Sequence, residues 1–128
     1  MGKSGFKELM VWQKSKSLAV AIYKVTDTGK IARDQGLTEQ LRRCAVSVPS
    51  NIAEGDERSS DKDSIRFFFM AKGSLAELIT QLEIACEVGH LTSEQITPLT
   101  AQAEELARRL GALIRSRQSP LAPRPSPR

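Results

Sequence analysis

The stretch QLRRCAVSVPSNIAEGDERSS, which covers residues 40–60, decides how the chain is expected to fold. A proline in the interior of a helix costs about 3 kcal/mol and usually kinks or ends the helix. On a wheel of 100° per residue, however, the apolar side chains keep one phase across Pro49. The unbroken phase predicts a helix that is kinked at Pro49 but continuous. The apolar arc consists of Leu37, Leu41, Cys44, Ala45, Val48, Ile52 and Gly55.

A second, polar stripe runs beside this apolar arc. Its members are three or four residues apart, so neighbouring side chains can touch. Small polar side chains fit a tightly packed contact better than a solvated face, which more often carries Lys, Glu and Arg. Four interpretations stay open: a seam between subunits, an ordinary solvated edge, a network within the chain, and a catalytic or ligand site, which is the least favoured. The stripe consists of Gln40, Arg43, Ser47, Asn51 and Glu54.

Two segments precede this stretch. Apolar residues at helical spacing predict a first helix from about Phe6 to Thr26. The segment TDTGKIARDQG, residues 26–36, contains two glycines and several turn formers, which predict a loop. The helix that contains Pro49 is then expected to start near Thr38, a plausible N-cap residue.

Two further helical segments follow. The third helix is predicted to begin near Asp61, after cap-forming residues, and to end before Gly89. TSEQ, residues 92–95, matches a capping box at the start of the last helix. Apolar residues of this helix alternate steps of three and four, which is typical of a heptad seam. The seam consists of Ile96, Leu99, Ala103, Leu106, Leu110 and Leu113.

Together these patterns predict an all-α protein, an antiparallel up-down-up-down four-helix bundle that covers residues 1–116. The remaining segment RQSPLAPRPSPR, residues 117–128, is rich in proline and basic, so we expect a disordered tail.

Four consecutive bulky apolar residues, Phe67 to Met70, point in nearly every direction on a helix. One bundle core cannot bury them all, which indicates a second partner. The alternative is a thick bundle whose loops cover the extra face. Gly73 costs about 1 kcal/mol against alanine in a helix interior, and we expect it to permit a close helix approach.

Positive charge is concentrated at the two ends of the chain, whose formal net charge is +4. Residues 1–34 carry seven basic and three acidic side chains, and residues 91–128 carry six and three. The basic side chains either contact phosphates, in which case the two end segments meet in one patch, or serve only solubility. The candidate nucleic-acid-binding residues are Lys14, Lys16, Lys24, Arg42, Arg108, Arg109, Arg115 and Arg117.

Other functional classes find little support. No apolar stretch is long enough for a membrane span and no secretory signal is present, so we expect a cytoplasmic protein without membrane contact. Cys44 and Cys86 are expected to be small buried hydrophobes in a reducing compartment. His90 is the single histidine, which argues against a metal site and against a serine or cysteine nucleophile with a histidine base. We therefore expect no enzymatic activity, cofactor or metal.

Three motifs resemble one protein family: VWQKS at 11–15, QLRRCAVSVPSNIAEG at 40–55 and AKGSLAEL at 71–78. The family is that of the four-helix-bundle proteins, also described as intervening-sequence proteins because some are encoded within insertions in bacterial large-subunit rRNA genes. The resemblance covers about residues 6–115. The matching positions are Gln40, Arg42, Arg43, Ser47, Pro49, Asn51, Ile52, Glu54, Gly55, Gly73, Ser74 and Glu77.

The resemblance implies a bacterial, cytoplasmic homopentamer without catalytic activity. The family is also similar to the accessory variability proteins of diversity-generating retroelements, which bind nucleic acid and a reverse transcriptase through a pentameric barrel. The chain departs from the family pattern at Cys44, where alanine is usual, and at His90, where tyrosine is common. The acidic DERSS after Gly55 weakens any claim that this corner grips phosphate.

We therefore expect a homo-oligomeric, pentameric scaffold that binds structured RNA or DNA weakly through basic faces. The alternative is an adaptor ring that docks a partner protein and binds nucleic acid only incidentally. A third possibility is a bundle without a retained role, the remnant of a mobile insertion.

Overall fold

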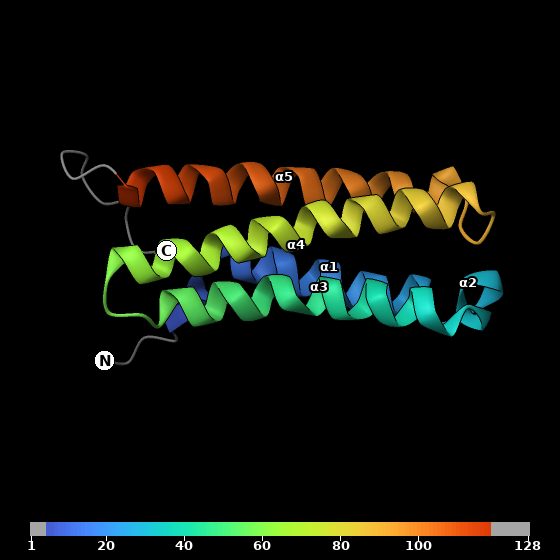
Figure 1. Cartoon of the computed structure of the whole chain (residues 1–128), viewed down its shortest axis with the longest axis horizontal. Helices are drawn as coiled ribbons and strands as arrows, with labels where there is room; N and C mark the ends of the chain where they lie inside the picture. Colours follow the sequence, from blue (N-terminus) through green and yellow to red (C-terminus); the bar gives the residue numbers. More distant parts are fainter. Residues whose placement is uncertain (1–4, 119–128) are drawn as a thin grey trace.

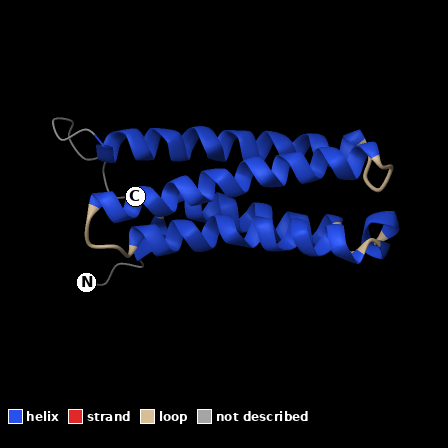
Figure 2. Ribbon diagram, in the orientation of Figure 1, coloured by secondary structure: helices blue, strands red, loops and turns tan. Residues whose placement is uncertain are grey.

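The computed structural model describes residues 5–118, and every regular element in this range is helical (Figure 2). The elements are a short 3-10 helix η1 (Gly5–Glu8), α1 (Met10–Val25), α2 (Gly29–Arg33), α3 (Gln35–Asp56), α4 (Asp61–Glu87) and α5 (Ser93–Gln118). The predicted all-α four-helix bundle is confirmed. Helix α5 continues two residues past the expected boundary at 116, and the rest of the predicted tail lies outside the described residues.

Figure 1 shows the four long helices side by side, with successive long helices running in opposite directions and α2 at one end of the bundle. Helix α3 packs against both α1 and α4, and α5 packs against both α4 and α1. None of the helices in the described range is long and apolar enough to cross a bilayer.

The core is aliphatic and continuous along the bundle. Six of the seven residues of the apolar arc that spans Pro49 are buried in this core, and the seventh, Leu37, is partly buried. The heptad seam of α5 is buried from Ile96 to Leu110, after which Ile114 replaces the partly buried Leu113. Burying one such side chain stabilises the fold by about 1.5–3 kcal/mol before conformational entropy is subtracted.

Helix α3 is continuous through Pro49, as the phase of its apolar residues predicted. Its start was predicted wrongly. The N-cap is Asp34, whose Oδ1 accepts a hydrogen bond of 3.1 Å from the amide of Leu37. Thr38 lies inside the helix, where its buried hydroxyl donates to the carbonyl oxygen of Ile31 at 2.7 Å.

The loop predicted over residues 26–36 is wrong in part, because α2 occupies its middle. Ile31 is 1% exposed, so one apolar side chain anchors this short turn of helix on the end of the core. Gly29, with φ +81°, supplies the left-handed conformation with which the turn begins.

The other helix caps were predicted correctly from the sequence. The Ser60 hydroxyl accepts a hydrogen bond from the amide of Asp63 at the start of α4. Gly89 has φ +86°, as expected after a helix C-cap. Thr92 and Gln95 form the predicted capping box: the Thr92 amide donates to Gln95 Oε1 at 2.8 Å, and the Gln95 amide donates to Thr92 Oγ1 at 3.1 Å.

Gly73 was expected to permit a close approach between helices, but the close approach lies at Gly55. A Cβ atom added at Gly55 would lie 2.8 Å from Cε1 of Phe68, whereas one added at Gly73 would meet nothing within 4 Å. Of the four bulky residues at 67–70, Phe68 is fully buried, while Phe69 and Met70 stay 50% and 47% exposed. The bundle thus leaves part of this run uncovered.

Candidate nucleic-acid interface

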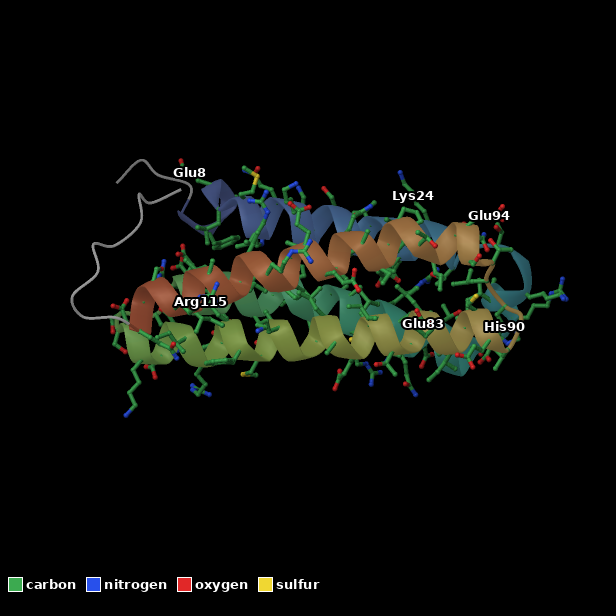
Figure 3. All side chains as sticks on the ribbon, turned by 90° about the horizontal axis from the view of Figure 1, so that it is seen from above. Glu8, Lys24, Glu83, His90, Glu94 and Arg115 are labelled. Atoms are coloured by element: carbon green, nitrogen blue, oxygen red, sulfur yellow. The ribbon has the colours of Figure 1, made fainter. Side chains whose placement is uncertain are left out.

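The predicted basic residues fall into separate groups and not into one patch. In Figure 3, Arg115 lies toward the end of the bundle at which Glu8 stands, whereas Lys24 lies toward the opposite end, near Glu94 and His90. Within residues 5–118, basic side chains of the two end segments come together around Glu105 of α5. Arg109 donates to Glu105 Oε2 at 3.0 Å, and Lys14 of α1 lines the same groove between α1 and α5.

The positive groups around Glu105 lower the pKa of its carboxyl group. The hydrogen bond from Arg109 and the positive charge of that guanidinium lower the pKa of Glu105, and the charges of Lys14 and Arg108 lower it further. Arg109 is therefore already engaged with a carboxylate, one helical turn away on an exposed surface. Arg108 is exposed and has no carboxylate within ion-pairing distance in the described part of the chain.

The other two arginines of α5 differ sharply from each other. Arg117 turns inward: its side chain is 10% exposed, lies 3.9 Å from Asp56 at the end of α3, and stacks on the ring of Phe68. Arg117 was expected to contact phosphate, but in the structure its side chain joins the end of α5 to Asp56 and Phe68. Arg115 is exposed and reaches across buried Gly111, next to Lys72 of α4.

The basic residues of α1 and α3 line a second groove. Lys16, Lys24 and Arg42 surround the apolar side chains of Val20 and Val46 between these two helices. The ammonium group of Lys16 lies 5.1 Å from the centre of the Trp12 ring. Trp12 is partly buried and packs edge-on against Phe6.

Arg42, one of the candidate nucleic-acid-binding residues, is engaged within the chain. Its Nε donates to Thr26 Oγ1 at 2.9 Å, its guanidinium lies 4.5 Å from the centre of the Tyr23 ring, and Asp27 is 4.0 Å away. The arginine therefore joins α3 to the end of α1. A helix wheel of α3 alone could not show this contact, because the acceptor Thr26 lies at the end of α1.

The polar stripe of α3 is divided between two environments. The Ser47 hydroxyl lies 2.6 Å from that of Ser74 on α4 and also donates to the carbonyl oxygen of Cys44. Asn51 donates to the carbonyl oxygen of Ser47 at 2.8 Å. This part of the stripe forms a network within the chain.

The ends of the stripe face outward. Gln40 and Arg43 are exposed and line a shallow hollow between α3 and α4. Glu54 pairs with Arg58 one turn later, at 2.6 Å, and not with Arg43. The hollow continues on α4 with Ser74, Glu77 and Gln81.

The thiol beside this hollow is not activated. Burial raises the pKa of Cys44 to about 12, and the charge of Glu77 adds to the rise. The thiol donates to the carbonyl oxygen of Ser74 at 2.9 Å. A nucleophilic cysteine requires a lowered pKa, so this environment is that of a structural residue.

Residues 5–118 contain no cluster of three or more His, Cys, Asp and Glu side chains that could hold a metal ion. His90 Nε2 instead lies 3.1 Å from Asp34 Oδ2, which ties the turn after α4 to the start of α3.

The structure also reveals cations that sequence patterns did not single out. Lys72 lies against α5 beside Arg115, and Lys30 and Arg33 line a hollow at the α2 end of the bundle. Lys72 lies within the AKGSLAEL stretch at 71–78 but is not among the matching positions, and no motif marks Lys30 or Arg33. Lys72 could have been found only from the register between α4 and α5.

Comparison with known proteins gives a family and a structural neighbour. The family model described as 23S rRNA-intervening sequence protein matches residues 7–112. A solved structure, described as a protein with unknown function from the S23 ribosomal protein family from Bacteroides thetaiotaomicron, superposes with a TM-score of 0.72 at 25% sequence identity. The match covers 82% of this chain and 98% of that chain. None of the curated proteins matches the chain.

Proposed function

The chain belongs to the 23S rRNA-intervening sequence protein family, and on that premise we propose that it is a non-enzymatic, homo-oligomeric scaffold that binds the phosphate backbone of structured RNA or DNA. The observation that carries the proposal is the pair Arg108 and Arg115. Both guanidinium groups are exposed on α5, and within residues 5–118 neither has a carboxylate within 4.0 Å. Arg109 and Arg117, by contrast, are engaged within the chain.

Self-association is supported by two apolar faces that a single bundle leaves open. One is the α1–α3 groove, with Val20, Tyr23 and Val46 between 41% and 48% exposed. The other is the outer side of α4. It presents Phe69, Met70, Ile84 and Val88, each 47% exposed or more.

Both faces carry charged side chains. The α1–α3 groove is lined by Lys16, Lys24 and Arg42 together with Asp27. The outer side of α4 carries exposed Lys62 and Arg66 in its first half and exposed Glu77, Glu83 and Glu87 in its second half, so only the second half is opposite in sign to the groove. Contact between two different faces is heterologous, and such contacts close into rings when the rotation permits. The resemblance to the family implies a ring of five subunits. A ring repeats every basic patch by symmetry, so weak phosphate contacts add through multivalency.

The test is a fluorescence-anisotropy titration of the full chain with a structured RNA and with a DNA duplex at several salt concentrations. Affinity should fall steeply as salt rises, because each phosphate contact releases counterions. Replacement of Arg108 and Arg115 by glutamate should abolish binding, while light scattering shows an unchanged oligomer size. Lack of binding by the wild type even at low salt would contradict the proposal and favour the protein-adaptor alternative.

A further inference from the structure

One site on the bundle has the composition of an oxyanion receptor, and it lies between α4 and α5 over Gly111. From the position that a Cβ of Gly111 would occupy, Nη1 of Arg115 is 3.4 Å away and Nζ of Lys72 is 3.7 Å away. Two cationic groups from different helices therefore converge on one point. Gly111 itself is buried, so these long side chains form its cover.

Convergence of two like charges is unfavourable unless an anion lies between them. Across the described helices, neither Lys72 nor Arg115 forms an ion pair with a carboxylate. The nearest acidic residue on this side of α5, Glu104, comes seven residues before Gly111, and Arg108 stands between the two. No carboxylate of the described residues lies within 4.0 Å of either cation, so the two positive charges reinforce each other at this point.

Glycine at position 111 leaves the floor of the site without a side chain. Glycine in the interior of a helix costs about 1 kcal/mol against alanine. Helix α5 has alanine at several other positions but glycine at 111. Without a side chain at Gly111, an oxyanion can approach between the two cationic groups. Arg115 offers a planar fork of N–H donors and Lys72 a compact ammonium group, a combination suited to the oxygens of a phosphate.

We propose that Lys72 and Arg115, above Gly111, bind one phosphate group, and that Arg108 attracts the phosphate that follows it on a nucleic-acid strand. This inference rests on the proposed function only for the identity of the ligand, since the same site would accept inorganic phosphate. Lys72 and Gly111 are the new members of the interface.

The first measurement is an NMR titration of the intact ¹⁵N-labelled protein with inorganic phosphate. The amide of Gly111 should shift in a saturable way, and the shift should be lost in Lys72→Gln/Arg115→Gln. The matched control is Lys30→Gln/Arg33→Gln, which removes two cations at the other end of the bundle, where both side chains are exposed. An unchanged Gly111 amide in the wild type would overturn the proposal.

The second measurement is the anisotropy titration with structured RNA on the same variants. Lys72→Gln/Arg115→Gln should weaken binding about tenfold or more and lower the slope of log affinity against log salt by about one, because one phosphate contact is lost. Gly111→Leu keeps both charges but fills the floor, so it should also weaken binding. Equal losses in the control variant would overturn the site and leave nucleic-acid binding in place. A saturable Gly111 shift without RNA binding would instead support the phosphate site and contradict the proposed function.

Discussion

Polar side chains of α3 form contacts between helices, whereas two arginines of α5 are exposed to solvent. On α3, Arg42 is bound to the end of α1 and Ser47 to α4, so these two polar side chains of the motif at 40–55 join helices to one another, while Gln40 and Arg43 stay exposed. On α5, Arg108 and Arg115 face outward without a carboxylate partner among the described residues. The most recognisable motif of the sequence therefore specifies the frame of the bundle, and the least distinctive stretch carries the charges available to a ligand.

The same contrast exists within α5, two residues apart. Arg117 is almost buried against Asp56 and Phe68, whereas Arg115 is exposed beside Lys72. Residue type thus says little about role, since the direction of the side chain decides whether an arginine stabilises the fold or meets solvent. Mutations that separate stability from binding test this division directly.

The largest expected effect is on Arg117. Arg117→Gln should lower the free energy of unfolding by about 3 kcal/mol, because it removes one member of an ion pair that is nearly inaccessible to water. Arg115→Gln, the matched control, should change stability by no more than about 0.5 kcal/mol. Urea denaturation followed by circular dichroism measures both. Equal losses for the two variants would contradict the division between frame and interface.

Gly55→Ala should follow, with a loss of about 1–2 kcal/mol. Overpacking against the fully buried Phe68 costs about 1–3 kcal/mol, and the better helix propensity of alanine offsets up to about 1 kcal/mol of it. The control is Gly73→Ala, where nothing lies within 4 Å of the new methyl group, so stability should rise. The prediction fails if both substitutions stabilise the protein in denaturant titrations.

A smaller effect is expected at the contact between α3 and α4. Ser47→Ala removes the 2.6 Å hydrogen bond to Ser74 and should cost about 1 kcal/mol. In a double-mutant cycle with Ser74→Ala, the two losses should not add, because both single variants break the same bond. Full additivity would show that Ser47 acts through solvent and not through α4.

Local patterns predicted much of this fold, because helix phase and caps depend on residues close in sequence. The apolar arc across Pro49, the cap at Ser60 and the capping box at 92–95 all lie within a few residues of their partners. The start of α3 was missed because Asp34 and Thr38 are both competent caps, and only the packing of α2 assigns Thr38 to Ile31.

The candidate site was harder to predict, because it depends on which residues of different helices lie side by side. The sequence placed Arg42 and Arg117 among the candidate nucleic-acid-binding residues, but their partners within the chain, Thr26 and Asp56, lie 16 and 61 positions away. Lys72 meets Arg115 only through the register of α4 against α5. Helix wheels describe one helix at a time and contain no information about that register.

The smallest effect at neutral pH is expected at Cys44, where the frame encloses a thiol. Its pKa is raised by burial to about 12 from an ordinary value of 9.0, so the thiol stays protonated in the folded state while the unfolded chain begins to ionise. Stability should therefore be independent of this group below pH 9 and should fall as pH rises from 9 toward 12. Comparing wild type with Cys44→Ala isolates this slope from every other pH-dependent contribution. In a Cys86→Ser background, a thiolate-specific reagent at pH 8.5 should label Cys44 only after denaturation, because the folded protein presents no thiolate. Labelling of the folded protein as fast as the unfolded chain would mean that α3 and α4 open at this point, and the frame would then be less rigid than its contacts indicate.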